Sequence, residues 1–347
     1  MNYSVDYFPS KRLCDIKDIW KTLEQGKDMT LFQSYDWYNM LLNCYVPEDT
    51  NNFISVFVVV SYDNHPCMIA PLWIVKHSFR FLNKKGIYLL GRDSYSDYLN
   101  FIYQHFDGNA FDYLIADIVK KYNVRKCTFE NIRELTDFYQ HIIHFNCYSV
   151  EDVSEPCVSL DVPTSLESYQ SLLSKNARQN LRTANNRLLK DGRNLVFCFD
   201  DKEVDKNHCL EIRESKLSEK YAKVSSLRKY KYRLVNKLLY HFPRFTPILT
   251  YSKSKVMTAK DENDNVRAFF HYAYDSEGHC VRVMSAGTDL NYARYSPGML
   301  LMYGFIKRII EEGTVHVVDF TRGDEKYKFV LGGDLNYNHK ITISINR

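Results

Sequence analysis

The chain has 347 residues, of which 45% are hydrophobic and 15% aromatic. This length exceeds the usual size of a single core, so two domains are expected, and the apolar content excludes general disorder. Lysine and arginine outnumber aspartate and glutamate by 46 to 42, which gives a net charge of +4. That excess is too small to indicate a nucleic-acid-binding protein from composition alone.

The nine cysteines are scattered, without a Cys-x-x-Cys motif or a nearby histidine at zinc spacing. Free thiols suit a reducing compartment, and no metal site is expected. The N-terminal residues lack the basic and apolar blocks of a signal peptide. The longest apolar runs, such as 54–61, are too short to cross a bilayer. We therefore expect a soluble, cytoplasmic protein without a membrane span.

The first half of the chain predicts a mixed α/β layer. A helix is expected within 30–44, starting near Ser34 or Asp36, because its apolar residues recur at helical spacing. Two apolar runs around a short polar turn predict a hairpin. The expected elements are the strands 53–61 and 67–75, a strand at 85–90, a helix at 111–122 and a strand at 126–130.

The second half repeats this order of elements. It predicts helices at 166–190, 202–217, 228–240 and 299–312, strands at 196–199, 281–285 and 315–320, and a hairpin of 256–260 and 267–274. Between the halves, 154–164 contains Pro156 and Pro163 and is either a boundary or a connecting strand. The repeated order predicts two domains, 1–160 and 161–347.

A short motif precedes the helix expected at 299–312. Ser296-Pro297-Gly298 leaves main-chain N–H groups free at the helix start, where anions bind. Serine capping and a proline in the first turn would explain the first two residues without a ligand. Glycine is explained less readily by capping, and it lets a bulky group approach the backbone closely.

The helix expected from Ser174 has two distinct faces. One face is apolar and the other is basic, at 100° per residue. The apolar positions are Leu173, Ala177, Leu181, Ala184 and Leu188, and the basic ones are Lys175, Arg178, Arg182 and Lys190. The basic face is either a solvated outer surface or the wall of a cleft that holds an anionic donor or acceptor.

Polar residues crowd together after the strand expected at 315–320. They are Asp319, Arg322, Asp324, Glu325, Tyr327 and Lys328. Ligands gather beyond strand ends in open sheets, which makes this corner a candidate site. The alternative is a surface turn with salt bridges that contribute little.

Several short motifs follow one another in the second half: 174–182 with Leu188 and Gly192, then 285–287, 295–298 and 319–323, followed by Tyr327-Lys328. In this order they resemble the FemAB-like branch of the GNAT acyltransferases, grouped with the CelD/BcsL-type acetyltransferase domain. The resemblance covers about 165–330. It implies an α/β (α+β) fold of two tandem GNAT-like domains, with mostly antiparallel mixed sheets flanked by helices.

The resemblance also implies where the donor binds. In GNAT proteins the pyrophosphate of coenzyme A lies on the amides of the corresponding helix start, which here comprises Ser296, Pro297, Gly298, Met299 and Leu300. The glycine-rich loop of typical members, with two glycines around a basic residue, is absent. This departure leaves aminoacyl-tRNA, the donor of FemAB relatives, as an alternative to acetyl-CoA or another acyl-CoA.

Catalytic roles follow from the chemistry of acyl transfer, which needs a base for the acceptor and an acid for the leaving group. Asp319 or Glu325 is the candidate base, and Tyr327 is the candidate acid for the departing thiolate. His271 is either a further base or a packed core histidine. No Gly-x-Ser-x-Gly elbow or Cys–His pairing is evident, so a covalent acyl-enzyme is not expected.

Substrate contacts are expected from residues of both halves. Ser96-Asp97-Tyr98 resembles a segment of the family's N-terminal part that closes over the acceptor, unless it is only a tight turn. The candidate substrate-binding residues are Asp97, Tyr98, Arg178, Arg182, Arg322 and Lys328.

The resulting hypothesis is an acyl-CoA-dependent N- or O-acyltransferase, with acetyl as the expected group. It would act on a sugar, a polysaccharide precursor or a peptide, by direct attack on the thioester. The first alternative is an aminoacyl-tRNA-dependent peptidyltransferase of the FemABX type, although no coiled-coil arm is evident in the sequence. The second is a non-catalytic GNAT-like scaffold or sensor in polysaccharide biosynthesis. Nucleic acid is an expected partner only if tRNA is the donor.

Overall fold

The computed structural model describes residues 2–44, 49, 53–76, 85–91, 96–144, 149–205, 208–209, 211–213, 215, 251–275 and 277–344. The chain forms two compact units: unit 1 is Met1–Pro156 with Tyr337–Arg347, and unit 2 is Cys157–Asn336. The division falls near the expected boundary at 160. The expected second domain, 161–347, loses its last residues to unit 1, because strand β12 (Asp334–Ser344) pairs antiparallel with β5 (Lys126–Arg133).

Unit 1 has the strand order β1-β2-β3-β4-β5-β12-β6. Its remaining elements are β1 (Tyr3–Pro9), α1 (Lys17–Leu23), α2 (Tyr35–Cys44), β2 (Phe53–Tyr62), β3 (His65–Val75), β4 (Gly86–Leu89), α3 (Gly108–Tyr122), α4 (Asp137–His144) and β6 (Ser149–Asp161). The two expected helices and the expected strands of this half are therefore confirmed, and 154–164 belongs mostly to a connecting strand. Strands β6 and β12 each contribute residues to both units.

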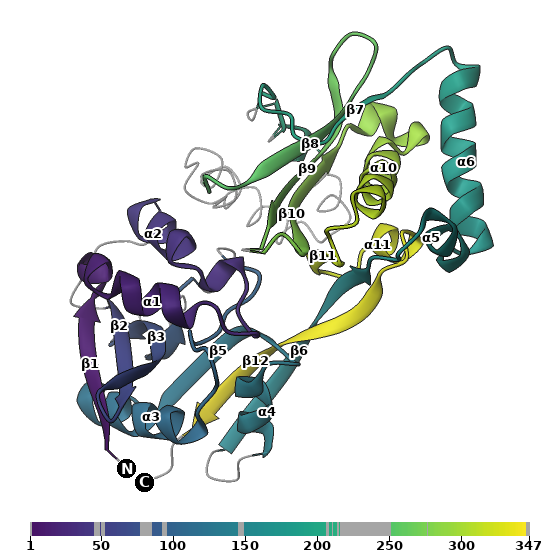
Figure 1. Cartoon of the computed structure of the whole chain (residues 1–347). Coiled ribbons are helices and arrows are strands. Elements are labelled where there is room, and N and C mark those ends of the chain that lie inside the picture. The colour runs from purple at the N-terminus through teal and green to yellow at the C-terminus, as the bar shows by residue number, and fades with distance from the viewer. Residues whose placement is uncertain are drawn as a thin grey trace, which may run out of the picture. The chain divides into compact units, whose positions relative to one another are not determined.

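Strand β2 shows why this sheet carries helices on both faces (Figure 1). Val56, Val58 and Val60 belong to the core that includes side chains of α3. Phe57 points the other way, where its ring lies 5.2 Å from Trp20 of α1 and 6.2 Å from Tyr38 of α2. Because alternate side chains of a strand face opposite sides, the continuous apolar run of β2 is buried from both.

Unit 2 has the strand order β6-β11-β10-β9-β8-β7. Its elements are α5 (Leu166–Leu172), α6 (Lys175–Lys190), β7 (Val196–Cys198), β8 (Lys255–Lys260), β9 (Val266–Tyr274), β10 (Cys280–Thr288), the 3-10 helix η4 (Leu290–Tyr295), α10 (Pro297–Glu312), β11 (Val317–Arg322) and α11 (Lys326–Val330). The helix expected at 228–240 lies outside the described residues. The one expected at 202–217 is described in part, and its residues 208–209, 211–213 and 215 are helical.

The single helix expected at 166–190 is in fact two helices. α5 ends at Leu172, and α6 begins at Lys175. Ser174 accounts for the new start, because its hydroxyl accepts a hydrogen bond from the Ala177 N–H at 3.1 Å. Serine capping of this kind satisfies a main-chain donor that the helix itself leaves free.

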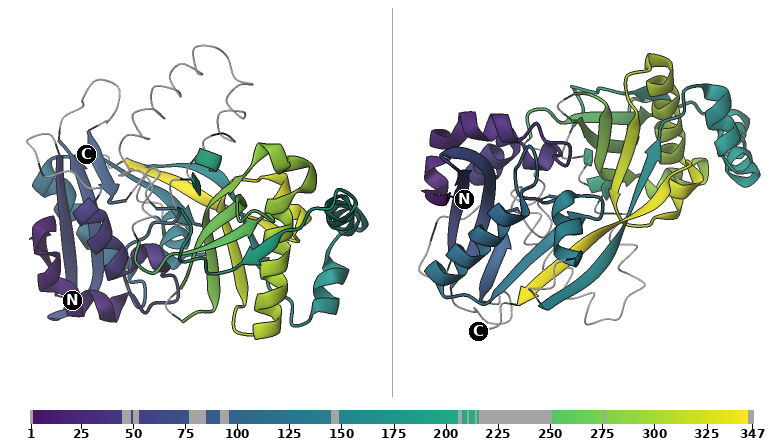
Figure 2. Two further views of the ribbon diagram at one scale, coloured as in Figure 1. Left: turned by 90° about the horizontal axis from the view of Figure 1, so that it is seen from above. Right: turned by 60° about the horizontal axis from the view of Figure 1, so that its bottom comes forward.

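Helix α10 lies between the sheet of unit 2 and α6 (Figures 1 and 2). Its inner side joins a core with Phe270 and Tyr272 of β9. The apolar stripe predicted for α6 is confirmed, since Ala177, Leu181, Ala184 and Leu188 are all buried in the same core.

Most strand pairs are antiparallel, and each unit has one parallel pair among the described strands. These pairs are β4 with β5 in unit 1 and β10 with β11 in unit 2. The predicted fold class, α/β with mostly antiparallel mixed sheets flanked by helices, is therefore confirmed.

Candidate functional site

The parallel strands β10 and β11 separate soon after they meet. Their register runs from Cys280 opposite Val317 to Arg282 opposite Asp319 and then stops, although β10 continues to Thr288 and β11 to Arg322. A register shift between Val283 and Ser285 adds a bulge to β10 at the same point. Bulges bend a strand and take main-chain groups out of the ladder. The result is a wedge between two strands that begin as neighbours.

Thr321 marks the edge of this wedge with a strained backbone. Its φ of 56° lies in the left-handed region, which β-branched residues rarely adopt. Two hydrogen bonds hold it there: its hydroxyl donates to the Val283 carbonyl at 3.0 Å, and its N–H donates to Asp319 Oδ1 at 2.8 Å. Strain of this kind concentrates at functional sites and indicates a constrained corner.

The start of α10 presents free main-chain donors, as predicted. Ser296 is the N-cap residue, yet its side chain makes no capping hydrogen bond. Pro297 has no N–H, and the Leu300 N–H bonds to the Ser296 carbonyl at 3.1 Å. Among the described residues, no acceptor is bonded to the N–H groups of Gly298 and Met299. These two amides and the helix dipole together form a candidate anion site.

Gly298 has a packing role that the sequence did not indicate. A Cβ at this position would lie 2.8 Å from the Thr288 hydroxyl and 3.8 Å from the Ala268 Cβ. Glycine therefore lets the first turn of α10 rest directly on the ends of β9 and β10. This contact brings the free amides to the mouth of the wedge.

A buried ionic network fixes the segment in front of α10. Arg267 donates to Asp261 Oδ2 at 2.6 Å and to Asp289 Oδ2 at 2.5 Å. Burial alone would raise the pKa of Asp261, but hydrogen bonds from Arg267 and from the N–H groups of Asn265 and Asn263 lower it to about 2. The network anchors η4 through Asp289, which caps it, and so positions the helix start.

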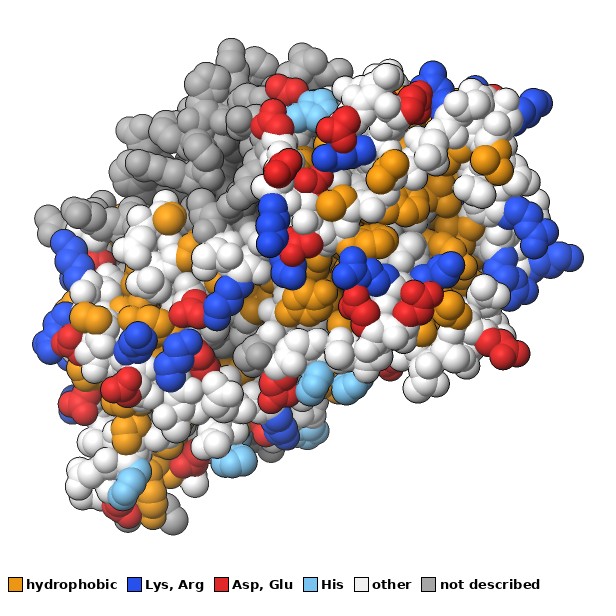
Figure 3. Space-filling model, turned by 45° about the horizontal axis from the view of Figure 1, so that its top comes forward, with side chains coloured by type: hydrophobic (Ala, Val, Ile, Leu, Met, Phe, Trp, Pro, Cys, Tyr) orange, Lys and Arg blue, Asp and Glu red, His pale blue; other side chains and the backbone are white. Residues whose placement is uncertain are grey.

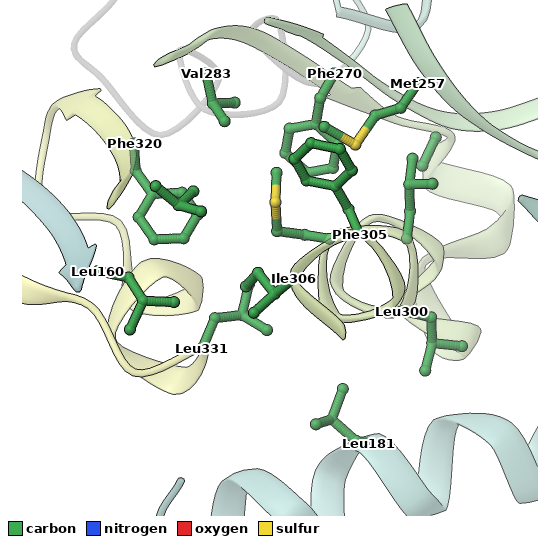
Figure 4. Close-up of a cluster of buried hydrophobic side chains, with 14 of the residues drawn as sticks. Leu160, Leu181, Met257, Phe270, Val283, Leu300, Phe305, Ile306, Phe320 and Leu331 are labelled. Atoms are coloured by element: carbon green, nitrogen blue, oxygen red, sulfur yellow. The ribbon is translucent and has the colours of Figure 1, made fainter. Parts of the chain in front are cut away.

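Tyr327 of α11 lies in the wedge on the α10 side. Its ring centroid is 6.4 Å from that of Phe270 and 6.3 Å from that of Phe320. Figure 4 shows Phe270, Phe320 and Val283 directed into this one core. Burial, and then the negative charge of Glu325, raise the pKa of Tyr327. Its hydroxyl has no hydrogen-bond partner among the described residues, so it stays protonated and available as a donor.

Lys328, a predicted substrate-binding residue, is instead engaged inside the corner. Its ammonium donates to the carbonyls of Thr321, Arg322 and Gly323 at 3.3, 2.8 and 2.9 Å, and lies 3.0 Å from a Glu325 carboxylate oxygen. The side chain is almost fully buried. An ammonium group has three donors, so this one is saturated by the loop that it holds together.

The face of the sheet opposite α10 carries a buried polar group of residues. Asp319 alternates with Val318 and Phe320, which face α10, and it therefore points away from that helix. The same alternation places Arg282 and His271 on this second face. Arg282 Nε lies 3.4 Å from Asp319 Oδ2, and Ser285 pairs with His271 across the ladder. Asp319 and Tyr327 thus flank the wedge from opposite faces.

The other predicted site residues are more dispersed. Arg322 and Glu325 lie beside Lys328, whereas Leu300 lies on the flank of α10 and not at its tip. Arg178 Nη1 is bound to the carbonyls of Gln170 and Leu173. Asp97 and Tyr98 belong to unit 1 and Arg178 and Arg182 to unit 2.

Asp97 and Tyr98 are held within unit 1 by other residues. Tyr98 is buried, and its carbonyl accepts a hydrogen bond from Gln33. The Asp97 carbonyl accepts one from Asn338.

Sequence reasoning missed Arg282, and it included Ser285 and Thr321 in the matching motifs without giving either a place in the site. Arg282 had a detectable signal, since an arginine between Val281 and Val283 in an apolar strand needs a buried partner. Within the described ranges, no group of three or more His, Cys, Asp or Glu side chains is arranged to hold a metal ion. The described helices include none that is both long and apolar enough to span a membrane.

Known proteins resemble this chain in domain sequence and in fold. Residues 258–329 match the family model described as an acetyltransferase (GNAT) domain. A tandem GNAT protein from the clavulanic acid biosynthesis pathway is 9% identical, with a TM-score of 0.53 over 100% of this chain and 99% of that one. A conserved protein of unknown function from Bacteroides thetaiotaomicron is 12% identical, with a TM-score of 0.54 over 96% and 97%.

FemX is also similar, at 11% identity and a TM-score of 0.49 over 97% of this chain and 96% of that one. No curated protein matches the chain in sequence. The matched domain comprises β8 to α11 almost completely, and so contains the wedge, the α10 start and Tyr327. The resemblance to the GNAT acyltransferases and the tandem architecture are thereby confirmed, and an acyltransferase is the class of enzyme that they support.

Proposed function

We propose that unit 2 is an acyl-CoA-dependent N- or O-acyltransferase, with acetyl as the expected group. The observation that carries this proposal is the wedge between β10 and β11 beside the free amides of α10. A long, thin donor with an anionic end fits this combination. Its phosphates would bind the N–H groups of Gly298 and Met299, and its acyl-bearing arm would enter between the strands.

Ser296, Pro297 and Leu300 shape the same helix start without donating to the phosphates. The bulge at Val283–Ser285 supplies main-chain groups outside the β9 ladder that can hydrogen-bond the donor arm or the developing oxyanion. The acceptor would be an amine or hydroxyl of a sugar, a polysaccharide precursor or a peptide.

The two faces of the wedge suit the two proton transfers of acyl transfer. The acceptor nitrogen or oxygen attacks the thioester carbonyl and passes its proton to Asp319 on the far face. The C–S bond then breaks, and Tyr327 donates its hydroxyl proton to the departing thiolate. No acyl-enzyme forms in this sequence of steps.

Glu325 has a supporting role in the proposal. Its negative charge helps to keep Tyr327 protonated, because ionising the phenol beside a carboxylate is unfavourable. Arg322 would attract an anionic acceptor at the same corner, and Lys328 would hold the corner's shape. Arg178, Arg182, Asp97 and Tyr98 have no part in these steps.

The test is turnover with acetyl-CoA, followed as free thiol, against amino sugars, sugar alcohols and peptide amines. We expect saturable release of coenzyme A that depends on the acceptor, without a burst of acylated protein in rapid quench. Calorimetric binding of acetyl-CoA without turnover on any acceptor would favour a sensor or scaffold. Retention of aminoacyl-tRNA with a steep salt dependence, and no binding of acetyl-CoA, would replace the proposed donor.

A further inference from the structure

A pocket lies on the outer side of α10, away from the wedge. It has a volume of about 570 Å³ and is lined mainly by α6, α10 and the segment that leads into β7. This volume falls in the range of about 300–1,000 Å³ that is typical of small-molecule sites. The residues that α10 contributes are Leu300, Tyr303, Gly304 and Lys307. They lie on the helix flank, whereas the proposed acyl-donor site uses Gly298 and Met299 at its tip.

The floor of the α6–α10 pocket is apolar. Leu181 and Leu188 of α6 and Leu300 of α10 line it and are buried, and Figure 4 shows Leu181 directed toward Leu300. Phe197 of β7 closes one side, where Gly304 leaves room for its ring at 3.3 Å from an added Cβ. At the rim, Leu189 is 69% exposed. An apolar floor that continues into an exposed leucine suits a hydrocarbon chain that enters from solvent.

The charged lining of the pocket is entirely basic. Arg178, Arg182, Arg193 and Lys307 line it, and no aspartate or glutamate does. Arg178 is bound to main-chain carbonyls, and Arg193 lies near Tyr292 and Glu262. No described residue gives Arg182 or Lys307 an ion pair or a side-chain hydrogen bond. Figure 3 shows hydrophobic side chains beside basic ones on this part of the surface.

We infer that the α6–α10 pocket binds a single-chain lipid that carries a phosphate monoester. The hydrocarbon chain covers the leucine floor, and the phosphate lies between Arg182 on α6 and Lys307 on α10. Guanidinium groups bind phosphate with two parallel hydrogen bonds, and ammonium groups add a point charge. The inference does not depend on acyl transfer, because the pocket shares neither amide of the proposed donor site.

Calorimetric titration of the full chain tests the inference directly. The probe is oleoyl lysophosphatidic acid below its micelle-forming concentration, compared with inorganic phosphate, which lacks the chain, and monoolein, which lacks the charge. We expect saturable binding of the lipid phosphate and at least tenfold weaker binding of the two fragments. Equal binding of either fragment would overturn the inference, as would binding only to phosphatidic acid vesicles and not to the monomer.

Surface variants locate the site without disturbing the core. Arg182→Ala combined with Lys307→Ala should weaken lipid binding at least tenfold. Leu189→Glu should also weaken it at least tenfold, because a carboxylate at the rim repels the phosphate and disfavours contact with the hydrocarbon chain. The matched control is Lys175→Ala with Lys190→Ala, which removes two charges from α6 outside the pocket and should leave affinity within twofold. Equal loss in the control pair would show a general charge effect and refute the assigned pocket.

Acetyl-CoA binding separates this inference from the proposed function. The Arg182→Ala, Lys307→Ala variant should bind acetyl-CoA as the parent does. Loss of lipid binding with acetyl-CoA binding intact supports a separate pocket. Parallel loss of both ligands would mean that they share one site, which contradicts the inference. Intact lipid binding in a parent protein that never binds acetyl-CoA would instead refute only the proposed donor.

Discussion

Each unit has a helix that connects the two strands of its parallel pair, but the side chains at the start of that helix differ between the units. In each, a helix leads from the first to the second strand of a parallel pair: α3 between β4 and β5, and α10 between β10 and β11. At α3 the Asp107 carboxylate accepts hydrogen bonds from the Asn109 and Ala110 N–H groups at 3.0 and 3.3 Å. At α10, among the residues that the structure describes, no side chain makes such a capping hydrogen bond.

The helices that follow the second strand of each parallel pair, α4 and α11, also differ in whether a tyrosine hydroxyl has a hydrogen-bond partner. Tyr139 of α4 donates its hydroxyl to Asp152 at 2.8 Å, and its ring lies 4.1 Å from that of His339. Tyr327 of α11 has no such partner among the described residues. Unit 1 thus satisfies with its own side chains the two hydrogen-bonding positions that the proposed function of unit 2 assigns to the donor and to the leaving group. The comparison teaches that one fold, used twice, can differ at these positions by a capping carboxylate and by the partner of a tyrosine.

The largest expected effect comes from the tyrosines. Tyr327→Phe should lower kcat by about 100-fold or more, the contribution of a positioned general acid, whereas Tyr139→Phe should leave it unchanged. Because the pKa of Tyr327 is raised above its usual value of about 10, parent activity should not fall on the basic side below pH 9. Steady-state kinetics across pH checks both points, and equal losses in the two variants would break the comparison.

Moving the carboxylate from one helix start to the other sharpens the comparison further. Ser296→Asp should weaken acetyl-CoA binding about tenfold by placing a negative charge beside the donor phosphates. Aspartate tolerates the left-handed conformation of Ser296, so folding should be retained. Removing the cap of α3 with Asp107→Ala should cost about 1 kcal/mol of stability and leave acetyl-CoA binding intact. Unchanged affinity in Ser296→Asp would argue against the α10 amides as the phosphate site.

Glycines in the first turn of the two helices offer a matched test. Gly298→Ala brings a Cβ to 2.8 Å from Thr288, and Gly108→Ala brings one to 2.4 Å from the His141 ring. Both should lower stability by about 1–3 kcal/mol, as overpacking does. Only Gly298→Ala should also raise the KM for acetyl-CoA, by about threefold, since it shifts the donor amides. Thermal unfolding and initial rates distinguish a shared packing cost from a site effect.

The smallest expected effect concerns the network in front of α10. Asp261 has a pKa of about 2 in the folded chain, against about 3.9 unfolded, so its charge stabilises the fold above pH 4 and less as pH falls toward 2. Asp261→Asn should lower the free energy of unfolding by about 2 kcal/mol at pH 7. The difference from the parent should shrink between pH 4 and pH 2 in urea unfolding. The exposed Asp264→Asn is the control, and an equal loss there would discount the network.

Sequence periodicity predicted the elements that are long and strongly patterned. The apolar run of β2 and the two-faced helix α6 were assigned correctly because burial alone determines them. The strand β12 was missed, although its buried Ile341 and Ile343 alternate with polar residues as in a half-buried strand. Its pairing with β5, about two hundred residues earlier, leaves no local signal.

The candidate site was predicted in part for the same reason. The free helix start follows from Ser296-Pro297-Gly298, which is a local motif. Lys328 was misplaced because nothing in its neighbours reveals that three carbonyls of its own loop surround it. The proximity of Arg282 to Asp319 was likewise not predicted. It depends on the register of the two strands and on the face of the sheet that each side chain occupies, and the spacing of residues in the sequence reveals neither.

The placement of β12 has a consequence for synthesis on the ribosome. This strand occupies the position between β5 and β6, yet it follows every other described element in the sequence. Domains emerging N-terminus first ordinarily fold as they appear. Here unit 1 cannot complete its sheet until β12 has left the ribosomal tunnel, because β5 and β6 would each keep an unpaired edge. Unit 1 should therefore complete its sheet only after β12 has been made, and a nascent chain stalled before residue 334 should remain sensitive to protease in residues 1–156.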